Sequence, residues 1–352
     1  MDSLTATLER MPQLRADIDA HPGRFRMLTG ERPTGPLHLG HLFGSVLERV
    51  RLQNLGIETF IVIADYQVIT DRATSANVHN NVLEAMMDYL AAGVDPTRTT
   101  TFTHSAIPAL NQLLLPFLSL VTDSELRRNP TVKSELAASE RPLSGLLLTY
   151  PVHQAADILF CKGNLVPVGK DNLPHVEITR TIARRFNERY GSDSGAIFPE
   201  PEALLTTTPE LPGLDGRKMS KSYGNAISLG MSADETAATI RRTQTDSDRH
   251  ITFDPDNRPG VSALLSTASV CTGEPPEAIA ATIADAGAGA LKNHVAEVVN
   301  DYLADHRSRR AELEADPAEV RRILAAGNER ANAIAEATLA EVRTAMGMDY
   351  TA

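Results

Sequence analysis

The sequence predicts an α/β protein, with a doubly wound parallel sheet followed by a C-terminal bundle of α-helices. Short apolar stretches with β-branched residues, at 59–65 and 99–103, alternate with amphipathic helical patterns. This alternation is typical of a parallel sheet with helices on both faces. After residue 223 the strand patterns stop and Ala-rich helical patterns follow. The 352 residues, 42% of them hydrophobic, are enough for a large core and two domains.

Hydrophobic periodicity and turn residues predict the individual elements. The predicted strands are 24–28, 59–65, 99–103 and NLVPVG at 164–169. The predicted helices are about 38–54, closed by Gly56, a helix capped by Ser75 that ends before Gly93, and 108–122, 152–160, 232–243, 261–271, 290–306 and 317–346. The chain is thus divided into an N-terminal extension (1–23), a Rossmann-type domain (24–222) with a polar helical insertion at about 123–145, and a helical domain (223–352).

Composition argues against several classes of protein. Only Cys161 and Cys271 occur, far apart and without metal-ligand spacing, so we expect a reduced, cytosolic protein. The sequence has no run of about 18 apolar residues, and its first 20 residues do not resemble a secretory signal, so neither a membrane span nor export is expected. The net charge of -11 lowers non-specific affinity for nucleic acid, although local basic patches can still bind phosphates.

The stretch Gly30–Val46, GERPTGPLHLGHLFGSV, leads from the first strand into a helix. A helix N-terminus offers free backbone N–H groups and a partial positive charge, which suits a phosphate. His38 and His41 lie three residues apart, so both imidazoles are expected on one face of the first turn. Gly40 between them leaves room for a flat ring against the backbone.

Two strings resemble the signatures of class I aminoacyl-tRNA synthetases. PTGPLHLGH resembles the HIGH motif, whose histidines and glycine hold ATP, and KMSKS at 218–222 matches the second signature without a mismatch. A mobile loop with Lys218 and Lys221 suits a pyrophosphate leaving group, because charge builds up on that group in the transition state. Taken alone, the first string also fits a helix N-terminus with incidental histidines, and the second fits a solvated turn.

Further strings resemble bacterial tryptophanyl-tRNA synthetases over residues 24–348. They are YP--QAADIL, LVPVG-D, H-E-TR, ARRFN-RYG, the segment from TDSD to FDPDNRPGVSALLS, and the terminal VRTAMGM. The resemblance implies activation of L-tryptophan with ATP and Mg²⁺, without a dedicated protein metal site. It also implies transfer to tRNA(Trp), whose anticodon the helical domain would hold, and a homodimer.

The resemblance assigns residues to ATP. Lys218, Lys221, His38 and His41 are the implied catalytic residues. The other implied ATP-binding residues are Arg32, Thr34, Gly35, Gly40, Lys133, Gly169, Asp171, Met219, Ser220 and Ser222. Asp171 is also a candidate partner of the substrate ammonium group. For most charged residues near Lys133, a solvated helix face is the alternative.

Asp157 is predicted to bind the indole ring. Its carboxylate would lie among Leu28, Val166 and Val168, where an unpaired charge costs several kcal/mol. An indole N–H is a suitable donor, and in the resembling family the aspartate of AADIL accepts it. The alternative is a carboxylate that caps or bridges helices.

Gln67 and Gln154 are also assigned to the indole pocket, where the tryptophan family usually has a histidine and a methionine. Side-chain amides that have no hydrogen-bond partner in this pocket predict relaxed indole specificity or resistance to an inhibitor that mimics tryptophan. Neutral repacking of the pocket is the alternative. Lys170 and Asn172 are further departures. Gln154 also fits a tyrosyl-tRNA synthetase, whereas Leu28 cannot donate a hydrogen bond to a phenol. A paralogue that binds tryptophan without charging tRNA is a third possibility.

Basic residues of the helical domain are candidates for tRNA binding. Arg307, Arg309, Arg310, Arg321 and Arg322 form a cluster in the sequence that could contact phosphates. A solvated face with i,i+4 ion pairs is the alternative.

Overall fold

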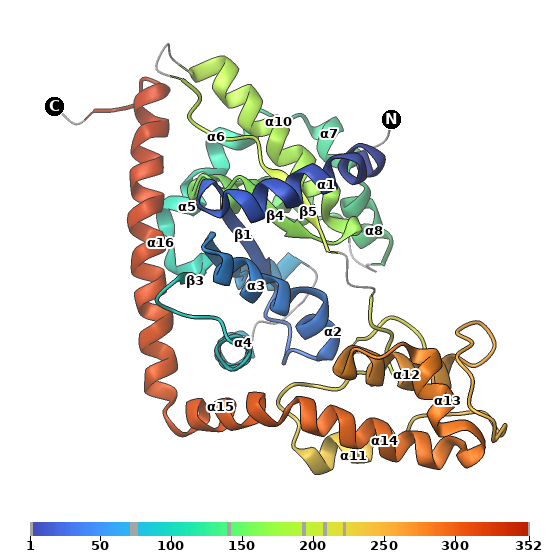
Figure 1. Cartoon of the computed structure of the whole chain (residues 1–352). Helices are drawn as coiled ribbons and strands as arrows, with labels where there is room; N and C mark the ends of the chain where they lie inside the picture. Colours follow the sequence, from blue (N-terminus) through green and yellow to red (C-terminus); the bar gives the residue numbers. More distant parts are fainter. Residues whose placement is uncertain are drawn as a thin grey trace.

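A parallel sheet lies at the centre of the molecule. The computed structural model describes residues 3–70, 77–138, 142–191, 195–206, 210–220 and 223–350, and the sheet within them has five strands in the order β3-β2-β1-β4-β5 (Figure 1). The strands are β1 (Arg26–Glu31), β2 (Glu58–Ile63), β3 (Thr99–Thr103), β4 (Leu165–Val168) and β5 (Glu202–Leu205), all paired in parallel. The predicted α/β class is confirmed. Because β2 and β4 flank β1, the strand order reverses there, and ligands of such sheets bind at the carboxyl ends of the strands beside this point.

The helices surround the sheet and continue beyond it. Before residue 223 they are α1 (Ser3–Ala20), α2 (Leu39–His41), a π-helical segment (Leu42–Val46), α3 (Leu47–Leu55), α4 (Val78–Ala91), α5 (Pro108–Gln112), α6 (Leu114–Leu118), α7 (Asp123–Arg128), α8 (Pro130–Ala138), α9 (Gly145–Phe160) and α10 (Leu173–Tyr190). After it they are α11 (Ala233–Arg241), α12 (Pro259–Thr272), α13 (Pro276–Ile283), α14 (Gly287–Tyr302), α15 (Ala304–Ala315) and α16 (Pro317–Ala345).

Most predicted elements occur near their expected positions. The strand 99–103 has the predicted bounds, and the helical run from α2 to α3 ends before Gly56. The first strand begins later than predicted and continues through Gly30. The expected single helix at 290–306 is divided at Leu303 into α14 and α15. Sequence patterns alone do not predict β5 or α13, and Ser75 lies outside the described residues.

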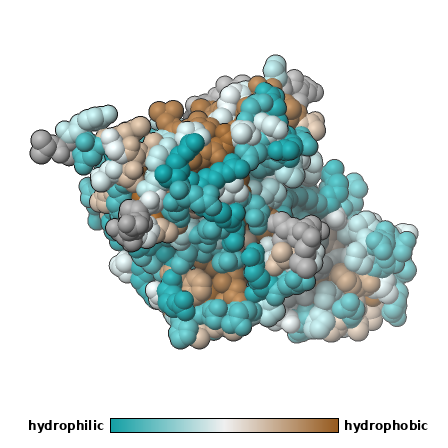
Figure 2. All heavy atoms as spheres, turned by 90° about the horizontal axis from the view of Figure 1, so that it is seen from above, coloured by the Kyte–Doolittle hydropathy of each residue, from teal (hydrophilic) through white to brown (hydrophobic). Residues whose placement is uncertain are grey.

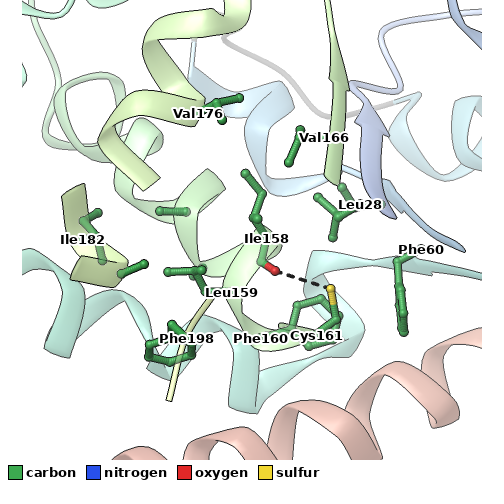
Figure 3. Close-up of a cluster of buried hydrophobic side chains, with 14 of the residues drawn as sticks. Leu28, Phe60, Ile158, Leu159, Phe160, Cys161, Val166, Val176, Ile182 and Phe198 are labelled. Carbon is green, nitrogen blue, oxygen red and sulfur yellow. Dashed lines mark hydrogen bonds between the residues drawn. The ribbon is translucent and has the colours of Figure 1, made fainter. Parts of the chain in front are cut away.

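Side chains of β2 alternate between two hydrophobic clusters, as the pleat of a strand requires. Phe60 and Val62 belong to a cluster that also holds much of α5, α9 and α10, part of which is drawn in Figure 3. Ile61 and Ile63 belong to a second cluster, shared with α4, α12 and α14. The sheet is therefore buried on both faces, one of them partly by the helices that follow residue 223.

Helix α16 covers the edge of the sheet along β3 (Figure 1). The Asn328 side-chain oxygen accepts the Thr103 N–H at 3.0 Å, and Arg330 donates to the Thr99 carbonyl at 3.2 Å. A Cβ added at Gly327 would fall 1.9 Å from the Thr101 carbonyl oxygen, so this close approach depends on glycine. The edge strand is thereby protected from pairing with another chain. A separate helical domain at 223–352 stays a prediction, and α16 contributes several side chains to the cluster around Phe60.

The face of the molecule shown in Figure 2 is mostly hydrophilic, with hydrophobic side chains in separate patches. None of the described helices is both long and apolar enough to cross a bilayer. Both cysteines are free, with Cys161 buried and Cys271 half-buried.

Candidate active site

The first signature forms the turn between β1 and α2. His38 is the N-cap residue of α2, and its backbone N–H donates to Nδ1 of His41 at 3.2 Å. The two imidazole rings lie 3.7 Å apart, centroid to centroid, and Nε2 of His41 is 3.8 Å from a carboxylate oxygen of Glu31. The π-helical segment directly follows α2, a feature that is frequent at functional sites. The paired histidines therefore form one compact unit at the carboxyl end of β1.

The second signature lies directly against the first. The Gly40 N–H points at the sulfur of Met219 at 3.3 Å. A Cβ added at Gly40 would lie 3.1 Å from the His38 ring and 3.4 Å from that sulfur. Residues 179 positions apart are thus in contact, and a side chain at position 40 would require the His38 ring to shift by a few tenths of an ångström.

A second connection follows the lysine loop. Leu39 N–H donates to the Ile227 carbonyl at 3.0 Å, and Leu229 N–H donates to the Leu37 carbonyl at 2.9 Å. The Ser228 hydroxyl also donates to the Leu37 carbonyl, at 3.1 Å. The chain leaving the second signature therefore pairs with the turn that carries His38.

Lys218 is exposed and its ammonium group lies 3.0 Å from Glu210. This hydrogen bond raises the pKa of Lys218, so the group stays charged near neutral pH. Asn225 fixes the loop, because its side chain accepts the Ser220 N–H at 2.8 Å and donates to the Lys218 carbonyl at 3.1 Å. Lys221 and Ser222 lie outside the described residues.

Three other predicted ATP residues lie in the chain between β1 and α2. Arg32 contacts the Thr70 hydroxyl at 3.5 Å and Glu135 at 3.5 Å. The Thr34 N–H donates to the Arg32 carbonyl at 2.7 Å, and Gly35 has a φ of 148°. The structure thus holds the chain between β1 and α2 in a tight turn.

Lys133 is exposed on α8, and this helix reaches the segment after β4. The Thr131 hydroxyl donates to the Asp171 carbonyl at 3.2 Å. The Asp171 carboxylate is close enough to Lys218 to favour its charged form, and it also lies against Gly169. Asp171, in the β4–α10 connection, is therefore near Lys218, and α8 contacts the same connection through Thr131.

Asp157 is 1% exposed on α9 and lies beside a histidine pair that the sequence analysis missed. Nε2 of His104 is 2.9 Å from Oδ1 of Asp157, in a geometry that makes no hydrogen bond. The rings of His104 and His153 lie 4.5 Å apart. His104 directly follows β3, a strand that the sequence predicts, and this position at a strand end is the signal that could have identified it as a site residue.

Asn111 determines the tautomer of His153. The Asn111 side-chain nitrogen donates to the carbonyls of His104 and Ile107, so its oxygen must face His153 Nε2, 2.8 Å away, and this nitrogen carries the proton. Burial lowers the pKa of His153, which favours the neutral ring. Ligand atoms of His104, His153 and Asp157 lie within 4.8 Å of one another, although no protein metal site was expected. A metal ion there would bind the Asp157 oxygen that is predicted to accept an indole N–H.

The side-chain amide of Gln154 has a hydrogen-bond partner, so the expectation that it is unpaired was wrong. Its oxygen lies 2.6 Å from Nδ1 of His175, and Nε2 of His175 lies 3.3 Å from the Tyr150 hydroxyl. Burial lowers the pKa of His175 to about 4, so the ring is neutral and carries one proton. Nδ1 therefore donates to Gln154, which leaves the unprotonated Nε2 facing the Tyr150 hydroxyl. The side-chain nitrogen of Gln67, in contrast, is buried and has no hydrogen-bond partner.

The predicted apolar wall belongs to the main core. Leu28 and Val166 lie near Ile158, the residue that follows Asp157 on α9 (Figure 3). Val168 is buried at the carboxyl end of β4. Cys161, at the end of α9, directs its thiol at the Ile158 carbonyl at 3.5 Å. The strands thus supply apolar side chains on the side of α9 that carries Ile158.

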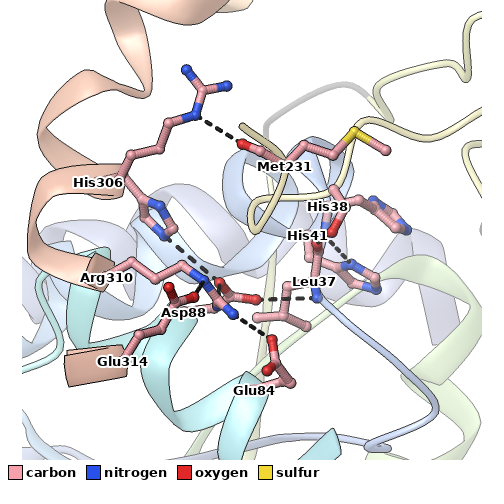
Figure 4. Close-up of polar contacts among 11 residues, drawn as sticks. Leu37, His38, His41, Glu84, Asp88, Met231, His306, Arg310 and Glu314 are labelled. Carbon is pink, nitrogen blue, oxygen red and sulfur yellow. Dashed lines mark hydrogen bonds and ion pairs between the residues drawn. The ribbon is translucent and has the colours of Figure 1, made fainter. Parts of the chain in front are cut away.

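The expected arginine cluster is divided by the structure. Arg310 is 5% exposed and pairs with Asp88, Glu84 and Glu314, so it is neither a phosphate contact nor part of a solvated face (Figure 4). Arg307 donates to the Met231 carbonyl at 3.0 Å. Arg309, Arg321 and Arg322 are exposed, and Arg322 pairs with Glu319.

Comparisons with known proteins support the family that both signatures indicate. A family profile described as "tRNA synthetases class I (W and Y)" matches residues 21–304. The tryptophan–tRNA ligase of Clostridium longisporum is 42% identical over 334 residues, which covers 92% of this chain and 97% of that protein. The tryptophan–tRNA ligase of Streptococcus pyogenes serotype M1 is 40% identical over 338 residues, with 92% and 98% covered.

A solved structure agrees as well. The tryptophanyl-tRNA synthetase of Campylobacter jejuni, complexed with ADP and tryptophan, superposes with a TM-score of 0.81 at 30% identity and covers 92% of this chain and 99% of that chain. The resemblance to bacterial tryptophanyl-tRNA synthetases is confirmed. The chain therefore belongs to the class I tRNA synthetases of the W and Y family.

Proposed function

We propose that this protein activates L-tryptophan with ATP and transfers it to tRNA(Trp). The contact between Gly40 and Met219 carries this proposal, because it brings both signatures of the family to one point at the carboxyl end of β1. The relatives that are 40–42% identical are tryptophan–tRNA ligases, which supports tryptophan over tyrosine. The C. jejuni structure with ADP and tryptophan supports an adenine nucleotide and an amino acid as ligands.

In the first step, a carboxylate oxygen of tryptophan attacks the α-phosphorus of ATP, and the bond to pyrophosphate breaks. In the second step, a hydroxyl of the terminal tRNA ribose attacks the carbonyl of the adenylate, and AMP leaves. Such reactions depend mainly on positioning and on stabilisation of charge. His38 and His41 hold ATP at the turn, and Lys218 and Lys221 stabilise the negative charge that develops on pyrophosphate.

Asp157 accepts the indole N–H in this proposal. Its buried Oδ1 lies 2.9 Å from Nε2 of His104 but makes no well-aligned hydrogen bond, so the carboxylate can still accept a donor from the ligand. A site built around a required hydrogen bond rejects analogues that lack the donor by orders of magnitude. Phenylalanine is therefore excluded without an editing domain.

Three further features belong to the same proposal. Mg²⁺ accompanies ATP, two copies of the chain form a homodimer, and the helices after residue 223 hold the tRNA anticodon. The reduced state of Cys161 and Cys271 supports a cytosolic location. The separate domains 24–222 and 223–352 are part of the same proposal.

Amino-acid-dependent exchange of pyrophosphate into ATP tests the proposal. Purified protein with ATP and Mg²⁺ should exchange labelled pyrophosphate when tryptophan is present, and tyrosine at the same concentration should support no comparable rate. Exchange that depends on tyrosine would favour the other branch of the family. Tryptophan binding without exchange would indicate a paralogue that does not activate the amino acid.

A further inference from the structure

A buried carboxylate on α4 holds the turn that carries the first signature. Asp88 is completely buried, and its Oδ2 accepts the backbone N–H of Leu37 at 3.2 Å (Figure 4). Leu37 immediately precedes His38. The hydrogen bond therefore fixes the chain one residue before the histidine pair.

Asp88 takes its counter-charge from the other end of the chain. Oδ1 of Asp88 pairs with one terminal nitrogen of Arg310 on α15, 222 positions later in the sequence. The other terminal nitrogen of Arg310 binds Glu84, and its Nε donates to Glu314 at 2.8 Å. Nε2 of His306 lies 4.0 Å from Asp88. Arg310 therefore bridges α4 and α15 beneath the turn.

The same helix also holds the chain that leaves the second signature. The Arg310 guanidinium lies 3.4 Å from where a Cβ of Gly230 would be. Arg307 donates to the Met231 carbonyl at 3.0 Å and to the Thr236 hydroxyl at 2.9 Å. Residues 227–229 just before this segment are paired with the turn at 37–39. Arg310 thus contacts Asp88, which holds the turn of the first signature, and Arg307 and Arg310 contact the segment 230–236, which follows the second signature.

Stability alone does not require this arrangement. Replacing a buried ion pair by apolar residues is often neutral or stabilising, whereas removal of one partner is strongly destabilising. Desolvation disfavours the charged form of Asp88 and raises its pKa to about 6, although Arg310 opposes this shift. The pair does, however, place a fixed acceptor at the Leu37 N–H, which an apolar pair could not do.

We propose that Asp88 and Arg310 are positioning residues for ATP, through which α15 holds the Leu37 backbone and hence His38 and His41. Asp88 and Arg310 act on ATP through the backbone of the turn, and α15 connects this turn to the other helices that follow residue 223. This inference rests on the proposed function, because it concerns the ATP side of that site.

Two double variants separate positioning from stability. D88N/R310M and D88L/R310M both remove the buried charges, but only the asparagine can still accept the Leu37 N–H. Michaelis constants for ATP and maximal rates come from pyrophosphate exchange. Tryptophan affinity and thermal stability are measured in parallel, and R184M, which removes an exposed arginine paired with Glu200, is the control.

D88L/R310M should show an ATP KM at least about tenfold above that of D88N/R310M, because a buried N–H has lost its acceptor. Tryptophan affinity should stay within about twofold in both, since the indole pocket is on α9. Equal ATP parameters in the two double variants would overturn the proposal. Should D88L/R310M fail to fold, R310Q and R310K replace it, because both side chains can still donate a hydrogen bond to Asp88. R310Q should raise the ATP KM and R310K should keep it nearer the wild-type value, whereas a wild-type ATP KM in R310Q would overturn the proposal.

The outcomes also separate this inference from the proposed function. Absence of tryptophan-dependent exchange in the wild-type protein contradicts the proposed function itself. Normal wild-type exchange with indistinguishable double variants contradicts only the role of Asp88 and Arg310.

Discussion

Asp157→Leu tests the indole pocket most sharply. Leucine has the same branching at Cγ, with methyl groups in place of the two oxygens, so it removes the carboxylate that is 1% exposed beside His104. A hydrogen bond to a charged group contributes about 1.5–3 kcal/mol. Tryptophan affinity should therefore fall by about ten- to a hundredfold. Asp157→Asn keeps an acceptor oxygen and should lose less.

An analogue separates this hydrogen bond from packing. In β-(3-benzothienyl)alanine a sulfur replaces the indole N–H, so this ligand cannot donate to Asp157. Calorimetric titration of both ligands gives the preference for tryptophan in each variant. The chain contains no tryptophan, so emission of the bound amino acid, excited in the indole band, provides a second and independent titration.

The wild-type protein should prefer tryptophan over the analogue by about tenfold or more, and Asp157→Leu should lose most of this preference while binding the analogue with nearly unchanged affinity. If Asp157→Leu keeps the full preference, the carboxylate does not recognise the indole N–H. Loss of affinity for both ligands to the same extent would indicate a structural role for Asp157 in α9.

Three further predictions concern the loop, the buried histidine and the glutamines. Lys218→Ala should lower the maximal exchange rate by roughly a hundredfold with little change in tryptophan affinity. The control Lys162→Ala removes a surface ion pair with Glu341 and should change neither the rate nor the affinity. A weakened tryptophan affinity at an unchanged rate in Lys218→Ala would contradict this role of the lysine. His175 has a folded pKa of about 4, below the ordinary 6.5, so the unfolded chain binds more protons between these values and stability should fall by about 3 kcal/mol as the pH drops from about 6.5 to 4. His175→Gln should flatten this part of the profile in urea unfolding, and an unchanged slope would refute the assignment. Gln67→His should change the ranking of tryptophan, 5-hydroxytryptophan and 4-nitrotryptophan as substrates in pyrophosphate exchange, and an identical ranking would indicate neutral repacking. Gln154→Met should chiefly reduce stability, because it removes the hydrogen-bond acceptor of His175.

The parts of the fold that follow from local pattern were predictable from the sequence. The strand 99–103 and the helix before Gly56 depend on residues close in sequence, so periodicity and a terminal glycine were sufficient. β5 has four residues, Glu202–Leu205, and too few positions for a periodic pattern. Its place at the sheet edge depends on pairing with β4.

The polar partners of the candidate site were not predictable in the same way. Gln154 was expected to be idle because its partner, His175, lies one helix away and no local pattern connects them. Arg310 was assigned to a surface because charged residues are usually exposed, whereas tertiary packing buries it against Asp88. Contacts between residues far apart in sequence depend on the complete fold.

Charging of tRNA tests the central claim most directly. Tryptophan, ATP and Mg²⁺ are incubated with a tRNA(Trp) transcript and with a tRNA(Tyr) transcript of the same organism, and aminoacylated tRNA is counted after acid precipitation. We expect tryptophan to be attached to tRNA(Trp), with Lys218→Ala strongly slowed and no tyrosine attached to either transcript. Failure to charge tRNA(Trp) by a preparation that catalyses tryptophan-dependent exchange, or attachment of tyrosine to tRNA(Tyr), would contradict the assignment as a tryptophan–tRNA ligase.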